Sequence, residues 1–223
     1  LTETIGLMRK CSIPKRNTCV KPGMENTYSK SLKVTSLMKI IPTAIADVFI
    51  IEPKVFGDER GFFLETFQAK RYQKEVGIML PFVQDNSSRS SYGVLRGLHF
   101  QRTKPQGKLV RVAQGEVFDV AVDIRKNSPT YGQWVGACLS DKNKRQLWAP
   151  PGLAHGFLVL SDTADFEYKC TDYYYPEEEG GVIWSDPALQ IPWPLEEPKL
   201  ADKDRLYPCL SDIAADQLPT YSQ

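Results

Sequence analysis

The chain has 223 residues, enough for one sizeable hydrophobic core, and all-β domains often reach this length as single units. Lysine and arginine number 28 against 27 acidic residues, so no basic surplus indicates a nucleic acid or an anionic membrane as partner. No apolar run approaches the roughly 18 to 20 residues of a membrane-spanning helix, which predicts a soluble protein.

The N-terminal residues 1–37 show no hydrophobic periodicity and contain only Glu3 and Glu25 as acids. This composition, rich in Lys, Arg, Ser and Thr, predicts a disordered extension. An organelle transit peptide, a bland tail and a translation start at Met38 remain open as explanations of it. We therefore expect one folded domain over residues 38–223.

From Ala44 onward the pattern changes to short β-type runs separated by Gly, Pro, Asn and Asp. In chain order these are "DVFIIEP", "GFFLETF", "LPFVQDNSSRS", "GVLRGLHFQ", "KLVRVAQGEVFDVAVDI", "QWVGACLS", "RQLWAP", "HGFLVLSD" and "DFEYKCTDY". Frequent turn signals between short strands predict a sandwich or a barrel. One short helix is expected around residues 68–76, and the Pro- and Trp-rich stretch 184–208 suits a packed irregular segment.

The run "EVFDVAVDI" tests the geometry, because side chains alternate along a strand. One face carries only apolar residues, and the other mixes small apolar residues with the carboxylates of Asp119 and Asp123. The mixed face either lines a cavity mouth or faces solvent, and the pattern alone does not distinguish the two.

The stretch "LRGLHFQ" carries His99, one of only two histidines. Strict alternation would send Arg96 and His99 to opposite faces, but Gly97 permits a bulge that brings both onto one face. The following "KPQGKLVR" predicts a hairpin that places Lys108 beside the His99 strand. A lysine near a base suits chemistry that builds negative charge on an oxygen, although a structural histidine and a solvated lysine remain open alternatives.

Metal-binding barrels of the cupin type share a His-x-His pair, and here Gln101 stands where the second histidine would be. Since His155 is the only other histidine, we expect no metal. Signatures of covalent nucleophiles, nucleotide hydrolysis and nicotinamide binding are missing. The five cysteines form no C-x-x-C pair, which favours reduced thiols of a cytoplasmic protein.

A larger set of segments, running in order from about residue 44 to about residue 212, resembles one family closely. They are "VFGDERGFF", "FVQDN", "GVLRGLHFQ", "GKLVRVAQGEVFDVAVDIR", "SPTYGQWVG", "LWAPPGLAHGFLVLSD", "YKCTDYYYPEEEGG", "WSDPAL", "IPWP" and "LADKDR". The family is that of the dTDP-4-dehydrorhamnose 3,5-epimerases.

The resemblance implies an all-β, double-stranded β-helix or jelly-roll (cupin-like) barrel with short peripheral helices. It also implies a cytoplasmic homodimer that uses no metal and no organic cofactor, and that has no nucleic acid or membrane partner. The implied reaction inverts C3 and C5 of dTDP-4-dehydro-6-deoxy-D-glucose on the route to dTDP-L-rhamnose and O-antigen. Relatives that epimerise one centre share these motifs, so a single-centre epimerase remains open, as does a silent sugar-nucleotide-binding cupin.

By motif, the resemblance assigns His99 as the base that removes the C3 and C5 protons. Asp204 in "ADKDR" is implied to orient that imidazole. Lys108 is implied to stabilise the enolate oxygen, and Tyr168 to deliver a proton from the other face. Residues implied to bind the substrate are Arg60, Phe63, Glu65, Gln84, Asn86, Arg96, Asp119, His155, Tyr174 and Lys203, with Asp119 holding a neighbouring histidine and with part of each pocket coming from the dimer partner.

Overall fold

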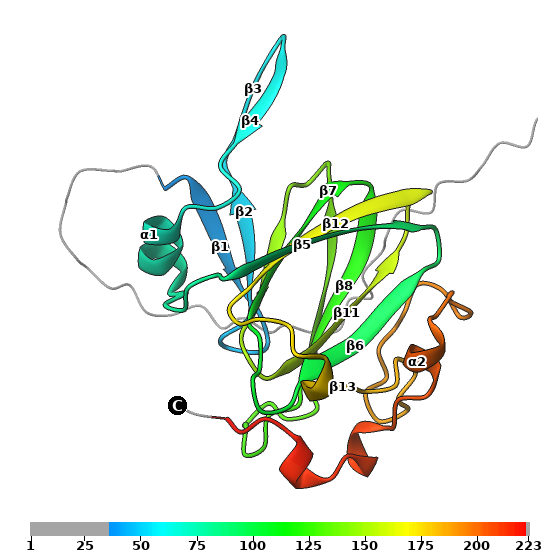
Figure 1. Cartoon of the computed structure of the whole chain (residues 1–223). Coiled ribbons are helices and arrows are strands. Elements are labelled where there is room, and N and C mark those ends of the chain that lie inside the picture. The colour runs from blue at the N-terminus through cyan, green and yellow to red at the C-terminus, as the bar shows by residue number, and fades with distance from the viewer. Residues whose placement is uncertain (1–35, 222–223) are drawn as a thin grey trace, which may run out of the picture. The chain divides into compact units, whose positions relative to one another are not determined.

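The computed structural model of this protein describes residues 36–221. The expected disordered extension over residues 1–37 therefore lies, except for its last two residues, outside the described part. Two antiparallel β-sheets form the body of the described part, as Figure 1 shows.

The first sheet has six strands in the order β1-β2-β10-β7-β12-β5. Its strands are β1 (Met38–Pro42), β2 (Phe49–Pro53), β5 (Gln84–Ser91), β7 (Lys108–Gln114), β10 (Gln146–Ala149) and β12 (Thr163–Cys170). The second has five strands in the order β13-β6-β11-β8-β9. These are β6 (Leu95–Gln101), β8 (Glu116–Asp123), β9 (Trp134–Ser140), β11 (Leu153–Val159) and β13 (Glu179–Gly181).

The chain changes sheet at nearly every connection. From β5 to β8, each strand lies in the sheet opposite to that of its predecessor, and β9 to β12 alternate in the same way. This alternation between two antiparallel sheets is the connectivity of a jelly roll, which confirms the predicted fold class.

The main core lies between the sheets. Phe157 of β11 stacks on Phe166 of β12 with ring centroids 4.0 Å apart, so the contact joins one sheet to the other. Strand β8 is buried on both faces, because Val117 packs into this core while Phe118 packs under the C-terminal segment. The solvent-exposed alternative for the Asp119 face is therefore wrong.

The helix expected near residues 68–76 is confirmed as α1 (Ala69–Arg71), which continues into the π-helical turn η1 (Tyr72–Val76). Before it, β3 (Val55–Asp58) and β4 (Gly61–Leu64) form a separate hairpin that projects away from the two sheets (Figure 1). This hairpin exposes 70% of Phe63.

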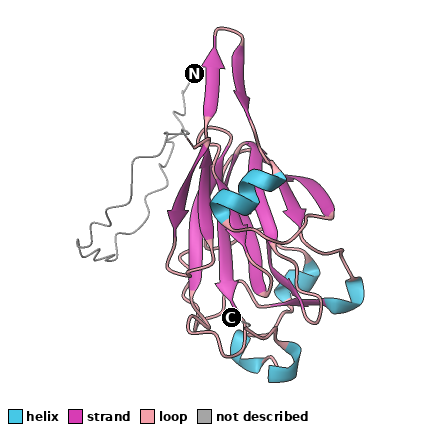
Figure 2. Ribbon diagram, turned by 90° about the vertical axis from the view of Figure 1, so that its left-hand side faces the viewer, coloured by secondary structure: helices cyan, strands magenta, loops and turns pink. Residues whose placement is uncertain are grey.

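The stretch 184–208 contains only one helix, α2 (Asp202–Arg205), and otherwise packs as an irregular segment, as predicted. Leu189 and Leu210 from this end of the chain bury the outer side of β8 at Phe118 and Val120. The remaining elements are the short 3-10 turns η2 (Pro176–Glu178), η3 (Leu210–Asp212) and η4 (Ala215–Gln217), and Figure 2 shows these short helices around the strands.

Two sequence expectations concern features other than the sheets. Among the described residues, none of the helices has the length and apolar character needed to span a bilayer. Cys170 and Cys209 are free thiols, which confirms the expected reduced state at these positions. The expectation is wrong for Cys138, which is disulfide-bonded.

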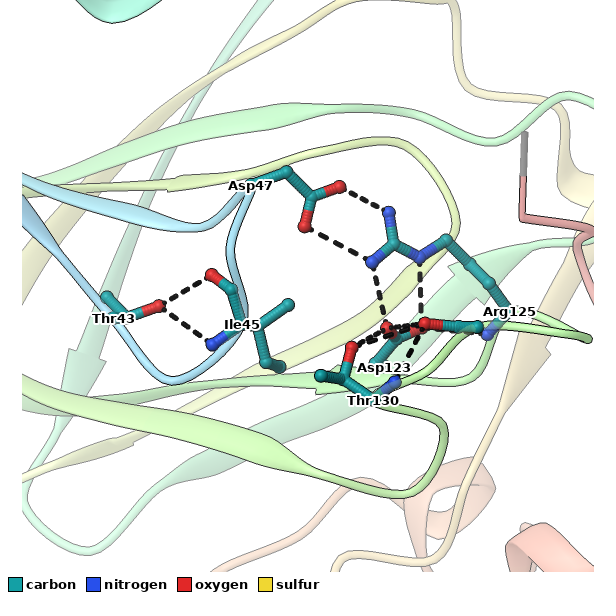
Figure 3. A network of polar contacts seen from close by, with 7 residues as sticks. Thr43, Ile45, Asp47, Asp123, Arg125 and Thr130 are labelled. Atoms are coloured by element: carbon teal, nitrogen blue, oxygen red, sulfur yellow. Dashed lines mark hydrogen bonds and ion pairs between the residues drawn. The ribbon is translucent and has the colours of Figure 1, made fainter. Parts of the chain in front are cut away.

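A buried ion-pair network ties the loop between β1 and β2 to the end of β8 (Figure 3). The Arg125 guanidinium donates to both carboxylate oxygens of Asp123, at 2.9 and 2.8 Å, and to Asp47 at 2.5 Å. Asp123 also accepts hydrogen bonds from Ser128 and Thr130, each 2.6 Å long. Burial alone would raise the pKa of Asp123, but these hydrogen bonds outweigh burial and lower it.

Replacing Arg125 with Met should lower the free energy of unfolding by about 3–5 kcal/mol, because the fully buried Asp123 carboxylate would lose its cation. The matched control is Arg89→Met, which breaks the exposed Arg89–Asp165 pair and should cost about 0–1 kcal/mol. Urea unfolding followed by tryptophan fluorescence measures both. Equal losses in the two variants would contradict the role given to the buried network.

Candidate functional site

A cavity of about 570 Å³ is lined by residues of both sheets and of α2. Ten of the fourteen residues predicted for the site line it: Gln84, Asn86, Arg96, His99, Lys108, His155, Tyr168, Tyr174, Lys203 and Asp204. They come from β5, β6, β7, β11, β12, the loop after β12, and α2, so the fold gathers residues that are up to 120 positions apart in the sequence. Within residues 36–221, no three His, Cys, Asp or Glu side chains are grouped so as to hold a metal ion.

The predicted bulge at Gly97 is confirmed. The register between β6 and β11 shifts at this point, and both Arg96 and His99 line the cavity. Gly97 has φ of +134°, and a Cβ there would lie 2.5 Å from the Cα of Gly156. Only glycine combines that backbone conformation with so close an approach.

His99 is paired with a buried carboxylate. Its Nε2 lies 2.7 Å from Oδ1 of Asp204, whose side chain is 2% exposed, while the imidazole itself is 26% exposed. The ring of Tyr207, two residues after α2, packs edge-to-face against the imidazole, with the two ring centroids 5.7 Å apart. Because Nε2 faces the carboxylate, Nδ1 is the nitrogen left for another partner.

Lys108 and Tyr168 approach from the six-stranded sheet. The predicted hairpin between β6 and β7 is wrong: β7 pairs with β10 and β12, and β6 pairs with β11 and β13. Lys108 nevertheless lines the cavity, with its Nζ 6.0 Å from the centroid of the Tyr168 ring. Burial lowers the pKa of Lys108 and raises the pKa of Tyr168.

The second histidine forms a second histidine–carboxylate pair. His155 Nε2 lies 3.1 and 3.0 Å from the two oxygens of Asp119, and both side chains are almost fully buried. Asp119 does not line the cavity itself, but it holds a histidine that does. The carboxylate face of β8 therefore neither faces solvent nor lines the cavity, because Asp119 is fully buried behind a histidine that does line it.

Cations and amides also line the wall, beside apolar residues such as Phe157 and Phe166. Arg96 lines the cavity, and its Nε donates to Ser90 Oγ at 3.1 Å. This hydrogen bond does not use the two terminal nitrogens of the guanidinium. Gln84 Nε2 donates to Asn86 Oδ1 at 3.1 Å, so two of the predicted binding amides are held together on β5. Lys203 forms an ion pair with Glu179.

Glu179 is a member of the site that the sequence did not indicate. It accepts hydrogen bonds from Tyr174 Oη at 2.6 Å, from Tyr207 Oη at 3.0 Å and from the Lys203 ammonium. Burial alone would raise its pKa, but these contacts outweigh burial and lower the pKa to about 2. In the sequence Glu179 is the third residue of a glutamate run, which looks like a solvated surface, so no local pattern could have identified it.

Three predicted residues lie outside the cavity of this chain, on or beside the β3–β4 hairpin. Arg60 pairs with Asp58 in the hairpin turn, and Phe63 is largely exposed. Glu65 Oε1 lies 3.2 Å from Arg71 Nε, within ion-pair distance but without good hydrogen-bond geometry. Their role in substrate binding therefore stays a prediction.

The chain is similar to proteins of known activity over most of its length. The family model described as dTDP-4-dehydrorhamnose 3,5-epimerase matches residues 42–212. The enzyme of that name from Salmonella typhimurium is 58% identical over 176 residues, which cover 78% of this chain and 96% of the relative.

Solved structures agree with this match. A dTDP-6-deoxy-D-glucose-3,5-epimerase from Legionella pneumophila, in complex with dTDP-4-keto-L-rhamnose, is 60% identical, with a TM-score of 0.82 over 83% of this chain and 100% of that one. A 3'-monoepimerase from Streptomyces bikiniensis in complex with dTDP-quinovose is 34% identical, with a TM-score of 0.75 over 81% of this chain and 92% of that one. The chain therefore belongs to the dTDP-4-dehydrorhamnose 3,5-epimerase family of isomerases.

Proposed function

We propose that the chain converts dTDP-4-dehydro-6-deoxy-D-glucose into dTDP-4-dehydro-L-rhamnose, by proton transfers at C3 and C5 that need no cofactor. The observation that carries the proposal is the His99–Asp204 pair, 2.7 Å apart, in one cavity with a half-buried lysine and a half-buried tyrosine of the opposite sheet. These are the groups that such a reaction requires, and the family relationship supports the choice of substrate.

The C4 ketone acidifies the hydrogens on both neighbouring carbons. His99 Nδ1 removes a proton, and the electrons of the broken C–H bond move to the C4 oxygen as an enolate forms. Asp204 accepts a hydrogen bond from Nε2–H, keeps Nδ1 unprotonated before the reaction, and stabilises the imidazolium that results. The Lys108 ammonium stabilises the enolate oxygen, more strongly because burial excludes water around it.

Inversion requires a new proton on the other face of the ring. Tyr168 projects from β12 of the six-stranded sheet, whereas His99 projects from β6 of the five-stranded sheet. Burial raises the pKa of Tyr168 and keeps its phenol protonated near neutral pH. The phenol donates its proton to the ring carbon as the enolate collapses back to the ketone, and the same pair then acts at the second carbon.

The charged walls suit a sugar nucleotide. Arg96 and Lys203 bind the diphosphate, and the Arg96 guanidinium can do so with two parallel hydrogen bonds. Gln84, Asn86 and Tyr174 contact the nucleotide and sugar, as does His155, which Asp119 holds in place.

The working form is a homodimer in this proposal. The β3–β4 hairpin projects away from the two sheets (Figure 1). Its Arg60 and Phe63 do not line the cavity of their own chain, and Phe63 is largely exposed. Exposed aromatic side chains of this kind are typical of residues that a partner covers. The hairpin, with Glu65 beside it, then completes the cavity of the second subunit.

Proton NMR in heavy water tests the function. The protein is incubated with dTDP-4-dehydro-6-deoxy-D-glucose, and deuterium at C3 and C5 is followed while a reductase traps the product. Deuterium at both carbons with a dTDP-L-rhamnose product is expected. Deuterium at one carbon would assign a single-centre epimerase, the alternative favoured by the similarity to a 3'-monoepimerase, and deuterium at neither would leave a binding protein.

Replacing Tyr168 with Phe should separate proton exchange from inversion. His99 can still remove a proton and return a deuteron to the same face, so the substrate should gain deuterium while product formation falls by roughly 10²- to 10⁴-fold. Tyr92→Phe, at an exposed tyrosine outside the cavity, serves as the control and should change neither rate. If exchange and product formation fall together, Tyr168 is not the acid.

Replacing Glu179 with Gln should destabilise the protein by an amount that depends on pH. The folded-state pKa of about 2 lies below the ordinary carboxyl value of 4.5. The contribution of Glu179 is therefore fully present above about pH 4.5 and is lost as the pH falls toward 2.

We expect a loss on the order of 2 kcal/mol at pH 7 that shrinks at pH 3. Urea unfolding of the wild type and the variant at both pH values measures it. The neighbouring Glu178→Gln, whose carboxylate is largely solvated and accepts a hydrogen bond from Thr103, should lose much less. A difference independent of pH would contradict the assignment.

A further inference from the structure

Gln101 occupies the last position of β6, two residues after His99, and is 4% exposed. Its side-chain amide makes three hydrogen bonds, all to the backbone. Nε2 donates to the carbonyl of Lys104 at 2.7 Å and to the carbonyl of Tyr173 at 3.1 Å. Oε1 accepts from the backbone N–H of Tyr175 at 2.7 Å. Both amide protons are therefore satisfied, and the carbonyl oxygen is as well.

These contacts bracket Tyr174 from both sides, because one goes to the residue before it and one to the residue after it. The N–H of Tyr174 itself donates to Gln84 Oε1 at 2.9 Å, and its hydroxyl donates to Glu179 at 2.6 Å. Two buried or half-buried glutamine amides thus hold three consecutive backbone positions, and Glu179 holds the end of the side chain.

Hydrophobic burial contributes little to this loop, because only Tyr175 is half-buried, with its ring centroid 3.7 Å from the Lys104 ammonium. Tyr173 is 56% exposed and Tyr174 is 49% exposed, so neither ring packs into the core. The loop conformation therefore depends on its polar contacts, which Gln106 extends with a hydrogen bond to the carbonyl of Asp172 at 2.8 Å.

We propose that Gln101 is a positioning residue for substrate binding, which holds the loop 173–175 so that Tyr174 stands at the cavity wall. This proposal rests on the proposed function for one point only, which is that the ligand bound next to Tyr174 is a dTDP-sugar. Gln101 makes no hydrogen bond to His99, Lys108 or Tyr168, so its effect should fall on binding and not on proton transfer.

The amide is required at this position because it carries donors and an acceptor at once. A glutamate would turn a carboxylate toward the two carbonyl oxygens of Lys104 and Tyr173 and would lose both donors. A methionine keeps a similar length and volume but makes none of the three bonds. The position that carries a metal ligand in metal-binding cupins here carries a group that orders a loop.

The test is a double-mutant cycle of Gln101→Met and Tyr174→Ala, read by calorimetric dTDP affinity and by turnover of the full-length protein. We expect Gln101→Met to raise the Kd for dTDP and the KM by about tenfold or more. We expect kcat to stay within about threefold of the wild-type value. In the Tyr174→Ala background, Gln101→Met should weaken dTDP binding little further, because the residue it positions is gone.

Gln146→Met is the matched control for lost stability. Gln146 is a buried glutamine of β10 that accepts from Tyr72 Oη at 2.7 Å and donates to the Thr66 carbonyl at 2.8 Å, and it does not line the cavity. Its replacement should lower the melting temperature comparably and leave the Kd for dTDP unchanged.

Wild-type affinity in Gln101→Met, full additivity in the cycle, or equally weakened binding in Gln146→Met would each overturn the proposal. A wild-type protein that binds dTDP but shows no turnover would overturn the proposed function instead, and the affinity cycle would still decide the role of Gln101.

Discussion

The site depends on one partly buried contact, the 2.7 Å hydrogen bond between His99 and Asp204. A carboxylate that is 2% exposed is costly unless its oxygens are paired, and Asp204 meets the imidazole with one oxygen and the Gly97 N–H, at 3.4 Å, with the other. The contact also fixes α2 against β6. Lys203 and Tyr207, which lie close to Asp204 in the sequence, both contact Glu179. The Asp204 and Glu179 carboxylates therefore stabilise the same side of the cavity, Asp204 through the imidazole and Glu179 through the lysine.

The two-sheet architecture explains how a candidate base and a candidate acid can approach one cavity from opposite sides. A jelly roll sends consecutive strands to opposite sheets, so the strand that carries His99 and the strand that carries Tyr168 face each other across the cavity. An inverting proton transfer requires a base and an acid on opposite faces of a ring. The same alternation also explains why Lys108, only nine positions after His99, comes from the other side.

Local patterns predicted the strands, the helix before β5 and the bulge at Gly97, because alternation, turn residues and glycine act over a few neighbouring positions. The turn before Lys108 was read as a hairpin because turn residues do not show whether the strands they connect share a sheet. Glu179 and Gln101 were not identified as parts of the site, since two of the three partners of each are distant in the sequence. These partners lie 24 and 28 positions from Glu179, and 72 and 74 positions from Gln101. Asp204 was found only through the family resemblance, for the same reason.

In the proposed mechanism a single base, His99, serves both carbons. The most direct measurement is deuterium incorporation at C3 and at C5 by His99→Ala, alongside its affinity for dTDP. We expect incorporation to be lost at both carbons while the Kd for dTDP stays within about threefold of the wild-type value. Continued incorporation at either carbon, with binding intact, would show that another group removes that proton and would contradict the role of His99 as the single base.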